Sequence, residues 1–350
     1  MILFKFKGVH CVVDGQFGST GKGALCAYLA DQAIRTGADI RFSGSIYSGG
    51  PNSGHTFYFQ GNKHVLKQLP TFSTYLSLNN KVIPAYLSAG AVIDRDILQR
   101  EAETYPNLPI FVHPNATIIT DEDRKAEEQG SIAEVAGTRS GTGAALARKI
   151  MREPRAIAAH SLGMLAKNVV LQNHRIKPER NAYFMEVAQG FSLGINSHFY
   201  PKVTSRECTV MQGLADARIP PRHLAMTYMA IRTFPIRVGD VDGHSSGTWY
   251  DDQQETTWER VGVEPEITTV TKRIRRVATF SMQQFYDACH ANDPDVVFVS
   301  HLDYLSGMDR EDFLLDIQAA RATLNKHFTI LGGYGPRVKD IKQENGEYAD

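Results

Sequence analysis

The chain has 350 residues, of which 42% are hydrophobic and 22% are charged, values that are ordinary for a globular enzyme. Its 38 basic residues balance 38 acidic ones, which argues against a nucleic-acid or membrane surface held by net charge. No apolar run approaches the roughly 20 residues of a membrane span, and the N-terminus lacks the apolar core and cleavage site of a signal peptide. We therefore expect a cytoplasmic protein (in the host cell, if a phage encodes it) without nucleic-acid or membrane partners.

Short apolar runs typical of strands alternate with helical segments along the chain. Strands are predicted at 9–13, 40–42, 57–60, 65–68, 183–187, 296–299 and 329–331, and helices at 23–36, 95–104, 142–152, 222–232, 282–292 and 310–327. This alternation predicts an α/β fold with a largely parallel central sheet flanked by helices. Residues 60–63 are typical of a hairpin turn. We expect one domain over residues 1–350, with the polar segment 239–266 as a candidate mobile insertion. The four cysteines have no paired spacing, which argues against a zinc or disulfide framework.

The first predicted strand leads into a glycine-rich turn, residues 14–23, and then into a helix. Backbone N–H groups and the positive end of the helix dipole point at an anion in such a turn, and Lys22 adds a full charge. The spacing differs from the common P-loop, because five residues separate Gly15 from Gly21 and Gly23 follows the lysine. The residues favour a phosphate-binding turn over a purely structural one.

This turn resembles the opening motif of adenylosuccinate synthetases, Gly-x-Gln-Trp-Gly-Asp-Glu-Gly-Lys-Gly. The resemblance implies that the donor nucleotide is bound by the matching positions Gln16, Gly18, Thr20, Gly21, Lys22 and Gly23, with Lys22 also catalytic. Phe17 stands for the tryptophan of the motif, and Ser19 and Thr20 stand for its acidic pair. In the family that aspartate is the catalytic base and a magnesium ligand. The resemblance therefore assigns Ser19 to catalysis, to contact with the substrate nucleotide and to metal binding.

A second glycine-rich loop, residues 49–56, is similar to the family's Gly-Gly-x-Asn-x-Gly-His-Thr. The resemblance implies that His55 polarises and protonates O6 of the purine and that Asn52 contacts the substrate nucleotide. It also implies that the Gly54 carbonyl binds Mg²⁺ and that Gly54, His55 and Thr56 contact the donor nucleotide. Imidazole suits this chemistry, because it can donate to an oxygen that becomes negative in the transition state. Without the resemblance, a lone loop histidine is more often a surface or structural residue.

Further matches imply the site of the substrate nucleotide. Thr138 lies in a turn that resembles the family's 5′-phosphate loop, Gly-Thr-Thr-Gly-x-Gly-x-Gly. Gln189 and Thr204 lie in segments similar to Glu-Gly-Ala-Gln-Gly and Tyr-Pro-x-Val-Thr-Ser, and they are implied to hold the nucleotide. Arg152 matches an arginine that reaches across the dimer interface, which implies a homodimer. From the residues alone, a solvated cation at a helix end is the preferred interpretation of Arg152.

A basic run at residues 271–276 resembles the Thr-Gly-Arg-Arg-Arg-Arg motif that binds the carboxylates of L-aspartate. The resemblance assigns Thr271, Arg273 and Arg275 to aspartate and Arg275 also to the donor nucleotide. Arginine fits this task because its guanidinium pairs with a carboxylate through two parallel hydrogen bonds. Most basic runs are instead solvated faces or nonspecific phosphate patches.

Two segments near the C-terminus resemble the part of the family's site that reads the donor base. Asp303 matches the aspartate of Thr-Lys-Leu-Asp, which contacts the guanine of GTP, and His301 replaces the lysine. Gly333, Gly335 and Pro336 lie in a segment similar to Ser-Thr-Gly-Pro. These departures leave ATP and dATP as alternatives to GTP.

Together these motifs occur in the family's order and imply a Mg²⁺-dependent ligase. The γ-phosphoryl group of the donor moves to O6 of a purine monophosphate, and the amine of L-aspartate then displaces phosphate at C6. Serine cannot act as the base at neutral pH, and Ser19 leaves room for the 2-amino group of guanine. The chain is thus similar to the bacteriophage branch of the family, which condenses dGMP with L-aspartate, using ATP or dATP, on the way to diaminopurine DNA.

Three alternatives remain open from the sequence. An ordinary adenylosuccinate synthetase would use IMP, L-aspartate and GTP, and Ser19 counts against it. A nucleotide-binding protein that has lost catalysis is compatible with Ser19 and Thr20, but the retained Lys22 and His55 argue otherwise. A P-loop GTPase is disfavoured by the spacing of the turn and by Gly23 after the lysine.

Overall fold

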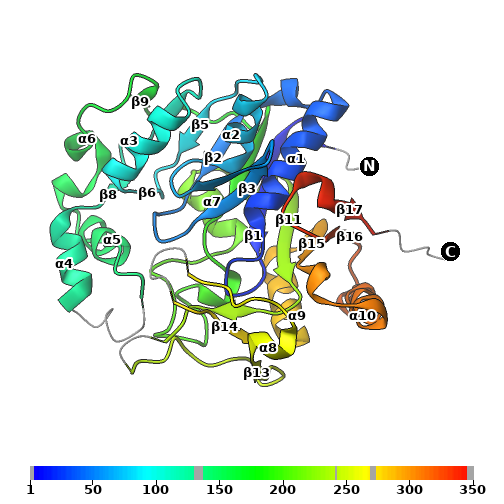
Figure 1. Ribbon diagram of the computed structural model, residues 1–350. Coiled ribbons are helices and arrows are strands. Elements are labelled where there is room, and N and C mark those ends of the chain that lie inside the picture. The colour runs from blue at the N-terminus through cyan, green and yellow to red at the C-terminus, as the bar shows by residue number, and fades with distance from the viewer. Residues whose placement is uncertain (1–3, 130–136, 241–242, 269–272, 345–350) are drawn as a thin grey trace.

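The computed structural model describes residues 4–129, 137–240, 243–268 and 273–344. Within them a ten-stranded sheet runs through the centre of the molecule (Figure 1). In spatial order its strands are β17 (Ile341–Gln343), β16 (Thr329–Gly333), β15 (Val296–Ser300), β11 (Leu224–Arg232), β1 (Gly8–Asp14), β10 (Ala182–Glu186), β2 (Phe42–Tyr47), β5 (Ala85–Leu87), β7 (Ile110–Val112) and β9 (Val169–Leu171). Every neighbouring pair is parallel except β16 and β17. The predicted α/β fold with a largely parallel sheet is confirmed.

Helices cover both faces of this sheet. They are α1 (Lys22–Thr36), α2 (Thr71–Leu78), α3 (Arg95–Thr104), α4 (Asp121–Gln129), α5 (Thr142–Ile150), α6 (Ala158–Ser161), α7 (Val210–Asp216), α8 (Trp258–Val261), α9 (Met282–Asn292) and α10 (Gly307–Leu324). One buried cluster packs α1 and α2 against the sheet through side chains such as Leu25 and Phe72. A second cluster packs α7, α9 and α10 on the sheet through Leu214, Phe285 and Ile317. Because both faces are covered, the central strands read as continuous apolar runs.

The predicted helix at 222–232 is wrong, because this segment is strand β11, preceded by a 3-10 turn at Pro221–His223. Its leucine, methionine and alanine residues favour a helix in isolation. In the fold, β11 lies between β1 and β15 and pairs with both, and burial between two neighbours outweighs local preference. The strand predicted at 40–42 instead begins at Phe42, after a 3-10 turn at Asp39–Arg41.

Three small sheets complete the fold. The predicted hairpin is confirmed: β3 (His55–Phe59) and β4 (Asn62–Leu66) are antiparallel, and both turn residues, Gln60 and Gly61, have positive φ, as a type I′ turn requires. Strand β6 (Val92–Ile93) pairs with β8 (Thr117–Ile118). A three-stranded sheet joins β12 (Ile236–Arg237), β14 (Arg276–Ala278) and β13 (Glu255–Thr256), so the segment 239–266 supplies β13 and α8.

The topology places several motifs at one edge of the central sheet. The parallel strands β1, β10, β11 and β15 are neighbours, and they end at Asp14, Glu186, Arg232 and Ser300. Ligands of open α/β sheets bind beyond the carboxyl ends of such strands. Among the described residues, no helix combines the length and apolar character needed to cross a membrane.

Candidate functional site

Asp14, which no motif singled out, organises the glycine-rich turn after β1. One carboxylate oxygen accepts hydrogen bonds from the backbone N–H groups of Gln16, at 2.8 Å, and Gly18, at 3.2 Å. The other accepts from the hydroxyl of Thr20, at 2.5 Å, and from the ammonium of Lys22, at 2.9 Å. The carboxylate is buried, so its four donors fix the path of the turn and the direction of Lys22.

Glycines allow this turn to approach two other motifs. A Cβ on Gly23 would lie 2.4 Å from the carbonyl oxygen of Thr56, and one on Gly21 would lie 3.2 Å from Cβ of Ser300. Gly21 also has a φ of 82°, which side-chain-bearing residues rarely adopt. The glycine-rich turn, the strand that begins at His55 and the end of β15 are thereby packed together.

His55 is held by a carboxylate from a neighbouring strand. Its Nδ1 lies 2.9 Å from Oε2 of Glu186, at the end of β10, and Oε1 of Glu186 accepts the backbone N–H of Phe72 at 2.8 Å. Both side chains are buried. The other ring nitrogen, Nε2, has no hydrogen-bond partner among the described residues. Glu186 therefore fixes the orientation of the ring, and Nε2 is available to a ligand.

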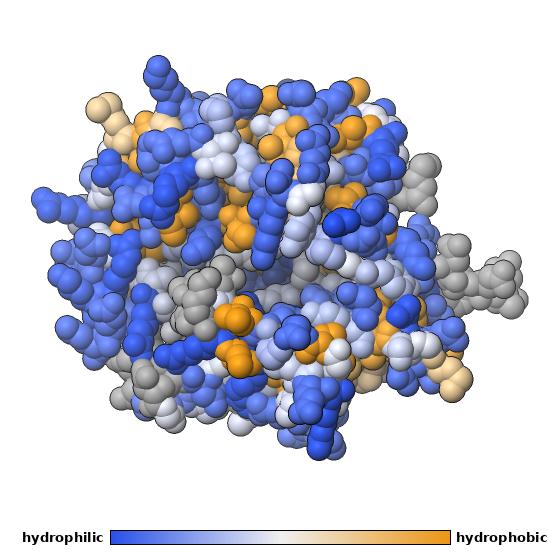
Figure 2. All heavy atoms as spheres, in the orientation of Figure 1, coloured by the Kyte–Doolittle hydropathy of each residue, from blue (hydrophilic) through white to orange (hydrophobic). Residues whose placement is uncertain are grey.

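A cavity of about 590 Å³ opens beside His55, where Figure 2 shows the surface hollowed near the middle of the face. The predicted site residues that line it are Gly18, Ser19, Lys22, Asn52, Gly54, His55, Thr138, Gln189, Thr204 and Arg275. These come from segments far apart in the sequence. The amide nitrogen of Gln189 is buried and, within the described part of the chain, has no partner. Lys22 donates to the Gln189 carbonyl at 2.7 Å, and this bond joins the glycine-rich turn after β1 to the segment that follows β10.

Ser19 projects from the turn into this cavity. The residue is exposed and has a φ of 56°, in the left-handed region. Its carbonyl accepts a hydrogen bond of 3.2 Å from the guanidinium of Arg232, a fully buried side chain at the end of β11. Arg232 thus fixes the backbone of the turn at Ser19, and the small side chain of Ser19 stays exposed at the wall of the cavity.

Other predicted residues lie outside the cavity. The amide of Gln16 exchanges hydrogen bonds of 3.1 and 2.9 Å with the backbone of Arg232, so its side chain braces the turn. The hydroxyl of Thr20 is directed at Asp14.

The other predicted residues outside the cavity lie farther along the chain. Arg152 is exposed just beyond α5. Arg273 donates to the carbonyl of Asp240 at 3.0 Å. Thr271 falls outside the described residues. The residues predicted for the donor base do not line the cavity: Asp303 follows β15, Gly333 ends β16, and Gly335 and Pro336 follow it.

The predicted phosphate loop is braced by Glu127, at the end of α4. Its carboxylate accepts the backbone N–H groups of Gly141, at 2.7 Å, and Gly143, at 2.6 Å, at the start of α5. These are the donors that a helix N-terminus would otherwise offer to an anion. The hydroxyls of Thr138 and Ser140 lie 3.2 Å apart at the cavity wall. We infer that side-chain hydroxyls, and not the end of the helix, are what the loop presents.

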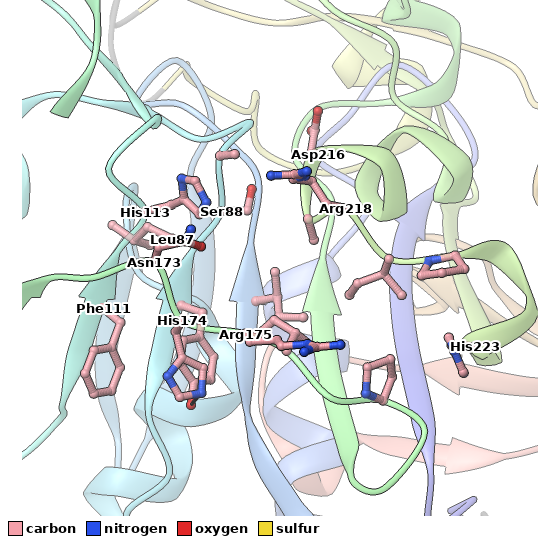
Figure 3. A pocket seen from close by; sticks show the side chains of 18 of the residues that line it. Leu87, Ser88, Phe111, His113, Asn173, His174, Arg175, Asp216, Arg218 and His223 are labelled. Atoms are coloured by element: carbon pink, nitrogen blue, oxygen red, sulfur yellow. Dashed lines mark hydrogen bonds between the residues drawn. The ribbon is translucent and has the colours of Figure 1, made fainter. Parts of the chain in front are cut away.

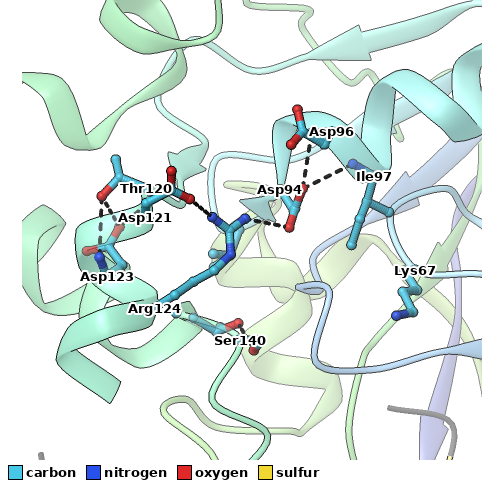
Figure 4. A network of polar contacts seen from close by, with 12 residues as sticks. Lys67, Asp94, Asp96, Ile97, Thr120, Asp121, Asp123, Arg124 and Ser140 are labelled. Atoms are coloured by element: carbon cyan, nitrogen blue, oxygen red, sulfur yellow. Dashed lines mark hydrogen bonds and ion pairs between the residues drawn. The ribbon is translucent and has the colours of Figure 1, made fainter. Parts of the chain in front are cut away.

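Ion pairs fix α4, and hence Glu127, against the rest of the fold (Figure 4). Arg124 bridges Asp94, at 2.8 Å, and Asp121, at 2.6 Å. Asp123 accepts the backbone N–H of Thr120 at 2.8 Å. The Arg124–Asp94 pair ties the N-terminal half of α4 to the start of α3, and the other two contacts stabilise the first turn of α4.

A second, larger cavity of about 850 Å³ lies elsewhere (Figure 3). Phe111 and His174 stack along one side of it, 5.6 Å apart, while Arg175 extends into its middle and Arg218 lies beside Asp216. No residue predicted from the sequence lines this cavity. The smaller cavity is the better candidate, because the glycine-rich turn, the oriented imidazole and the unpartnered buried nitrogens meet there.

The sequence and fold resemble known proteins over most of the chain. A family model described as adenylosuccinate synthetase matches residues 11–169 and 155–313. The N6-succino-2-amino-2′-deoxyadenylate synthase of Vibrio phage phiVC8 is 36% identical over 352 residues, covering 96% of this chain and 98% of that protein. A structure of the Cyanophage S-2L succinoaminodeoxyadenylate synthetase, bound to dGMP and dATP as an energy donor, matches with a TM-score of 0.84 and 33% identity over 96% of this chain and 95% of that one. Fully ligated adenylosuccinate synthetase from Plasmodium falciparum, at 17% identity and a TM-score of 0.74 over 97% of this chain and 100% of that one, shares the fold.

Proposed function

The chain belongs to the adenylosuccinate synthetase family and is a carbon–nitrogen ligase, and we propose that it condenses dGMP with L-aspartate to give 2-amino-2′-deoxyadenylosuccinate. ATP or dATP supplies the phosphoryl group, and the product serves the synthesis of diaminopurine DNA. The phage relatives, and the related structure that holds dGMP and dATP, support this choice of substrates.

The observation that carries the choice of purine is the exposed Ser19 at the cavity wall. Guanine differs from hypoxanthine by a 2-amino group next to N1. A carboxylate at this position would fill the space beside N1, whereas a hydroxymethyl group leaves room for the amino group and can accept a hydrogen bond from it. Ser19 thus favours dGMP over IMP.

The proposed reaction has two steps. The γ-phosphoryl group moves from the donor to O6 of the purine, the bond from phosphorus to the donor's β-phosphate oxygen breaks, and the proton on N1 of guanine passes to water. The amine of L-aspartate then forms a bond to C6 while the phosphate leaves with O6. His55 acts with hydrogens on both ring nitrogens: the Nδ1–H donates to Glu186, and the Nε2–H donates to O6 as negative charge develops there. Lys22 neutralises charge on the transferred group.

The cavity also fits Mg²⁺. Ser19 and Gly54 both line it; they would offer a hydroxyl and a carbonyl oxygen, and oxygen atoms are the ligands that this hard cation takes. Mg²⁺ commonly takes one or two protein ligands and is otherwise held by substrate phosphates and water. When bound, Mg²⁺ would neutralise charge on the transferred phosphoryl group.

The remaining predicted residues complete the proposed site. Asn52, Thr138 and Thr204 would contact the substrate nucleotide, and Gln189 would offer its unpartnered amide nitrogen to it. Arg275 would bind an aspartate carboxylate at the cavity wall. Arg152 is exposed beyond α5, as an arginine that completes the site of a second subunit must be, and we propose a homodimer on that basis.

The test is phosphate release by the purified chain with Mg²⁺ and L-aspartate, in which dGMP, GMP and IMP are crossed with ATP, dATP and GTP. We expect aspartate-dependent release with dGMP and with ATP or dATP. Turnover of IMP with GTP instead would show an ordinary adenylosuccinate synthetase. Silence with every pair would favour a nucleotide-binding protein without activity.

A further inference from the structure

Arg232 and Glu266 form an ion pair beneath the nucleotide turn that no sequence motif indicated. Arg232 is fully buried, and its guanidinium pairs with both carboxylate oxygens of Glu266, one of them, Oε2, at 3.2 Å from Nη1. The same Nη1 donates to the carbonyl of Ser19. A buried guanidinium requires such partners, because an uncompensated charge there is strongly destabilising.

Glu266 also stands at the base of the segment that carries the proposed aspartate-binding arginines. Its carbonyl accepts the backbone N–H of Arg275 at 2.8 Å, and the next pair inward, Ile267 and Ile274, forms an antiparallel bridge. Arg273 donates its backbone N–H to the hydroxyl of Thr268 at 2.9 Å. The backbone of Glu266 therefore sets the position of Arg275, while its side chain sets that of Arg232.

A third segment meets the same carboxylate. The hydroxyl of Tyr304 donates to Oε1 of Glu266 at 3.2 Å, and Nε2 of His301 lies 3.9 Å from that oxygen. Both residues follow β15, beside the predicted contact to the donor base, Asp303. The cationic partners hold the pKa of the Glu266 carboxyl at about 2, although burial alone would raise it. The carboxylate is therefore ionised wherever the protein is folded at neutral pH.

We propose that Glu266 is a positioning residue that couples aspartate binding at Arg275 to the geometry of the Ser19 turn, through Arg232. This inference rests on the proposed function. An aspartate bound by Arg275 stabilises the backbone bond between Arg275 and Glu266, and thereby the contact through which the Glu266 carboxylate holds Arg232 against the carbonyl of Ser19. Such coupling is reciprocal. Bound dGMP at the turn that carries Ser19 therefore raises the affinity for L-aspartate, and bound L-aspartate raises the affinity for dGMP by the same factor.

The experiment uses equilibrium binding without any donor nucleotide, so that no phosphoryl group is available and no reaction occurs. The affinity for dGMP is measured by calorimetry with and without saturating L-aspartate. We expect L-aspartate to tighten dGMP binding by about fivefold or more in the unmodified chain, within the usual range of coupling between sites. In Glu266→Gln, which keeps the size of the side chain and removes its charge, the ratio falls to about one.

Glu264→Gln is the matched control, because it makes the same chemical change two residues away on an exposed side chain. We expect this variant to keep the ratio of the unmodified chain. Tyr304→Phe removes a single hydroxyl contact to Glu266 and reduces the ratio partly, and it carries the test if Glu266→Gln does not fold. A purely structural role for Glu266 would instead lower thermal stability and leave the ratio unchanged.

Two outcomes overturn the inference alone: an unmodified chain that turns over dGMP but shows no coupling, and a Glu266→Gln variant that keeps the full ratio. Failure of the unmodified chain to bind dGMP at all contradicts the proposed function, and the inference with it. The two failures are therefore distinguishable in the same set of titrations.

Discussion

His55 and Glu186 form a buried pair in which Nδ1 lies 2.9 Å from the carboxylate, and the opposite ring nitrogen is buried without a partner among the described residues, in a residue that lines the cavity. The carboxylate holds a hydrogen on Nδ1 and fixes the ring plane, and its negative charge stabilises the doubly protonated ring that is needed for Nε2 to donate as well. An imidazole that is buried, oriented and free at one end is suited to act on an oxygen that gains charge.

Removal of the Glu186 charge should therefore affect the chemical step. Glu186→Gln keeps an acceptor for the Phe72 N–H. Its uncharged amide, however, no longer holds a hydrogen on Nδ1 of His55 as the carboxylate does. We expect kcat to fall by about 10²-fold, as is typical of lost general acid catalysis, and KM for dGMP to change little. His55→Ala should also lower mainly kcat. Steady-state kinetics check both, and an unchanged kcat in either variant would contradict the assigned role.

Ser19→Asp tests the choice of purine. The larger, charged side chain would meet the 2-amino group of guanine, so we expect a loss of dGMP turnover of about 10²-fold or more, the scale of a disrupted polar contact in a substrate site. Ser306→Asp, at an exposed position before α10, is the control and should keep its activity. Full dGMP turnover in Ser19→Asp would remove the argument from Ser19, provided that thermal unfolding shows both variants to be folded.

The two arginines of the basic run should differ in their effect on aspartate. Arg275 lines the cavity, whereas the guanidinium of Arg273 contacts the carbonyl of Asp240. We expect Arg275→Ala to raise KM for L-aspartate by about 10- to 100-fold, the value of a charge-assisted hydrogen bond of about 1.5–3 kcal/mol. Arg273→Ala should raise the same KM by less. Equal and unaltered aspartate KM values in the two variants would reject this assignment.

Glu127 should support the binding of dGMP from behind the phosphate loop. Glu127→Ala leaves the N–H groups of Gly141 and Gly143 without their carboxylate and loosens the loop that presents Thr138. We expect KM for dGMP to rise while KM for L-aspartate stays unchanged. Glu128→Ala, which alters the exposed neighbour on α4, is the control. A rise in both KM values would indicate general damage to the site.

His10 should make the stability of the protein depend on pH. Its ring is buried, with Nε2 at 2.9 Å from the carbonyl of Lys5 and Nδ1 at 3.1 Å from the hydroxyl of Tyr228. Burial lowers the pKa of His10 from 6.5 to about 4. Because the unfolded chain binds the proton more tightly, this contribution is fully present above pH 6.5 and is lost as the pH falls to about 4. It amounts to about 3 kcal/mol of unfolding free energy, at about 1.4 kcal/mol per pKa unit.

Denaturant unfolding at pH 7.5 and pH 4.5 measures that loss. His10→Gln should show a smaller difference between the two pH values, whereas His290→Gln, at an exposed position in α9, should keep the difference of the unmodified chain. An identical difference in His10→Gln would mean that the burial of this ring is not what links stability to pH.

Local patterns were sufficient for much of the architecture. The glycine-rich turn at the end of β1, the start of α1 and the hairpin at Gln60 and Gly61 each depend on residues close in sequence, and the structure contains all three. The family resemblance followed from such short motifs and is confirmed by the comparisons. The site residues taken from the resemblance remain predictions, although many of them line one cavity.

Only the tertiary structure decided which charged residues are buried next to the motif residues, and that residues 224–232 form strand β11. The sequence assigned no role to Asp14 or to the Arg232–Glu266 pair, because a lone charged residue usually indicates a solvated position, and it showed Glu186 only as the first residue of a matched motif. Their burial is tolerable only because partners from distant strands arrive in the fold, as Glu186 does for His55. In the same way, β11 is a strand because β1 and β15 flank it. Short-range sequence determines turns and caps, whereas pairing across the sheet determines which charges can be buried and which segment becomes a strand.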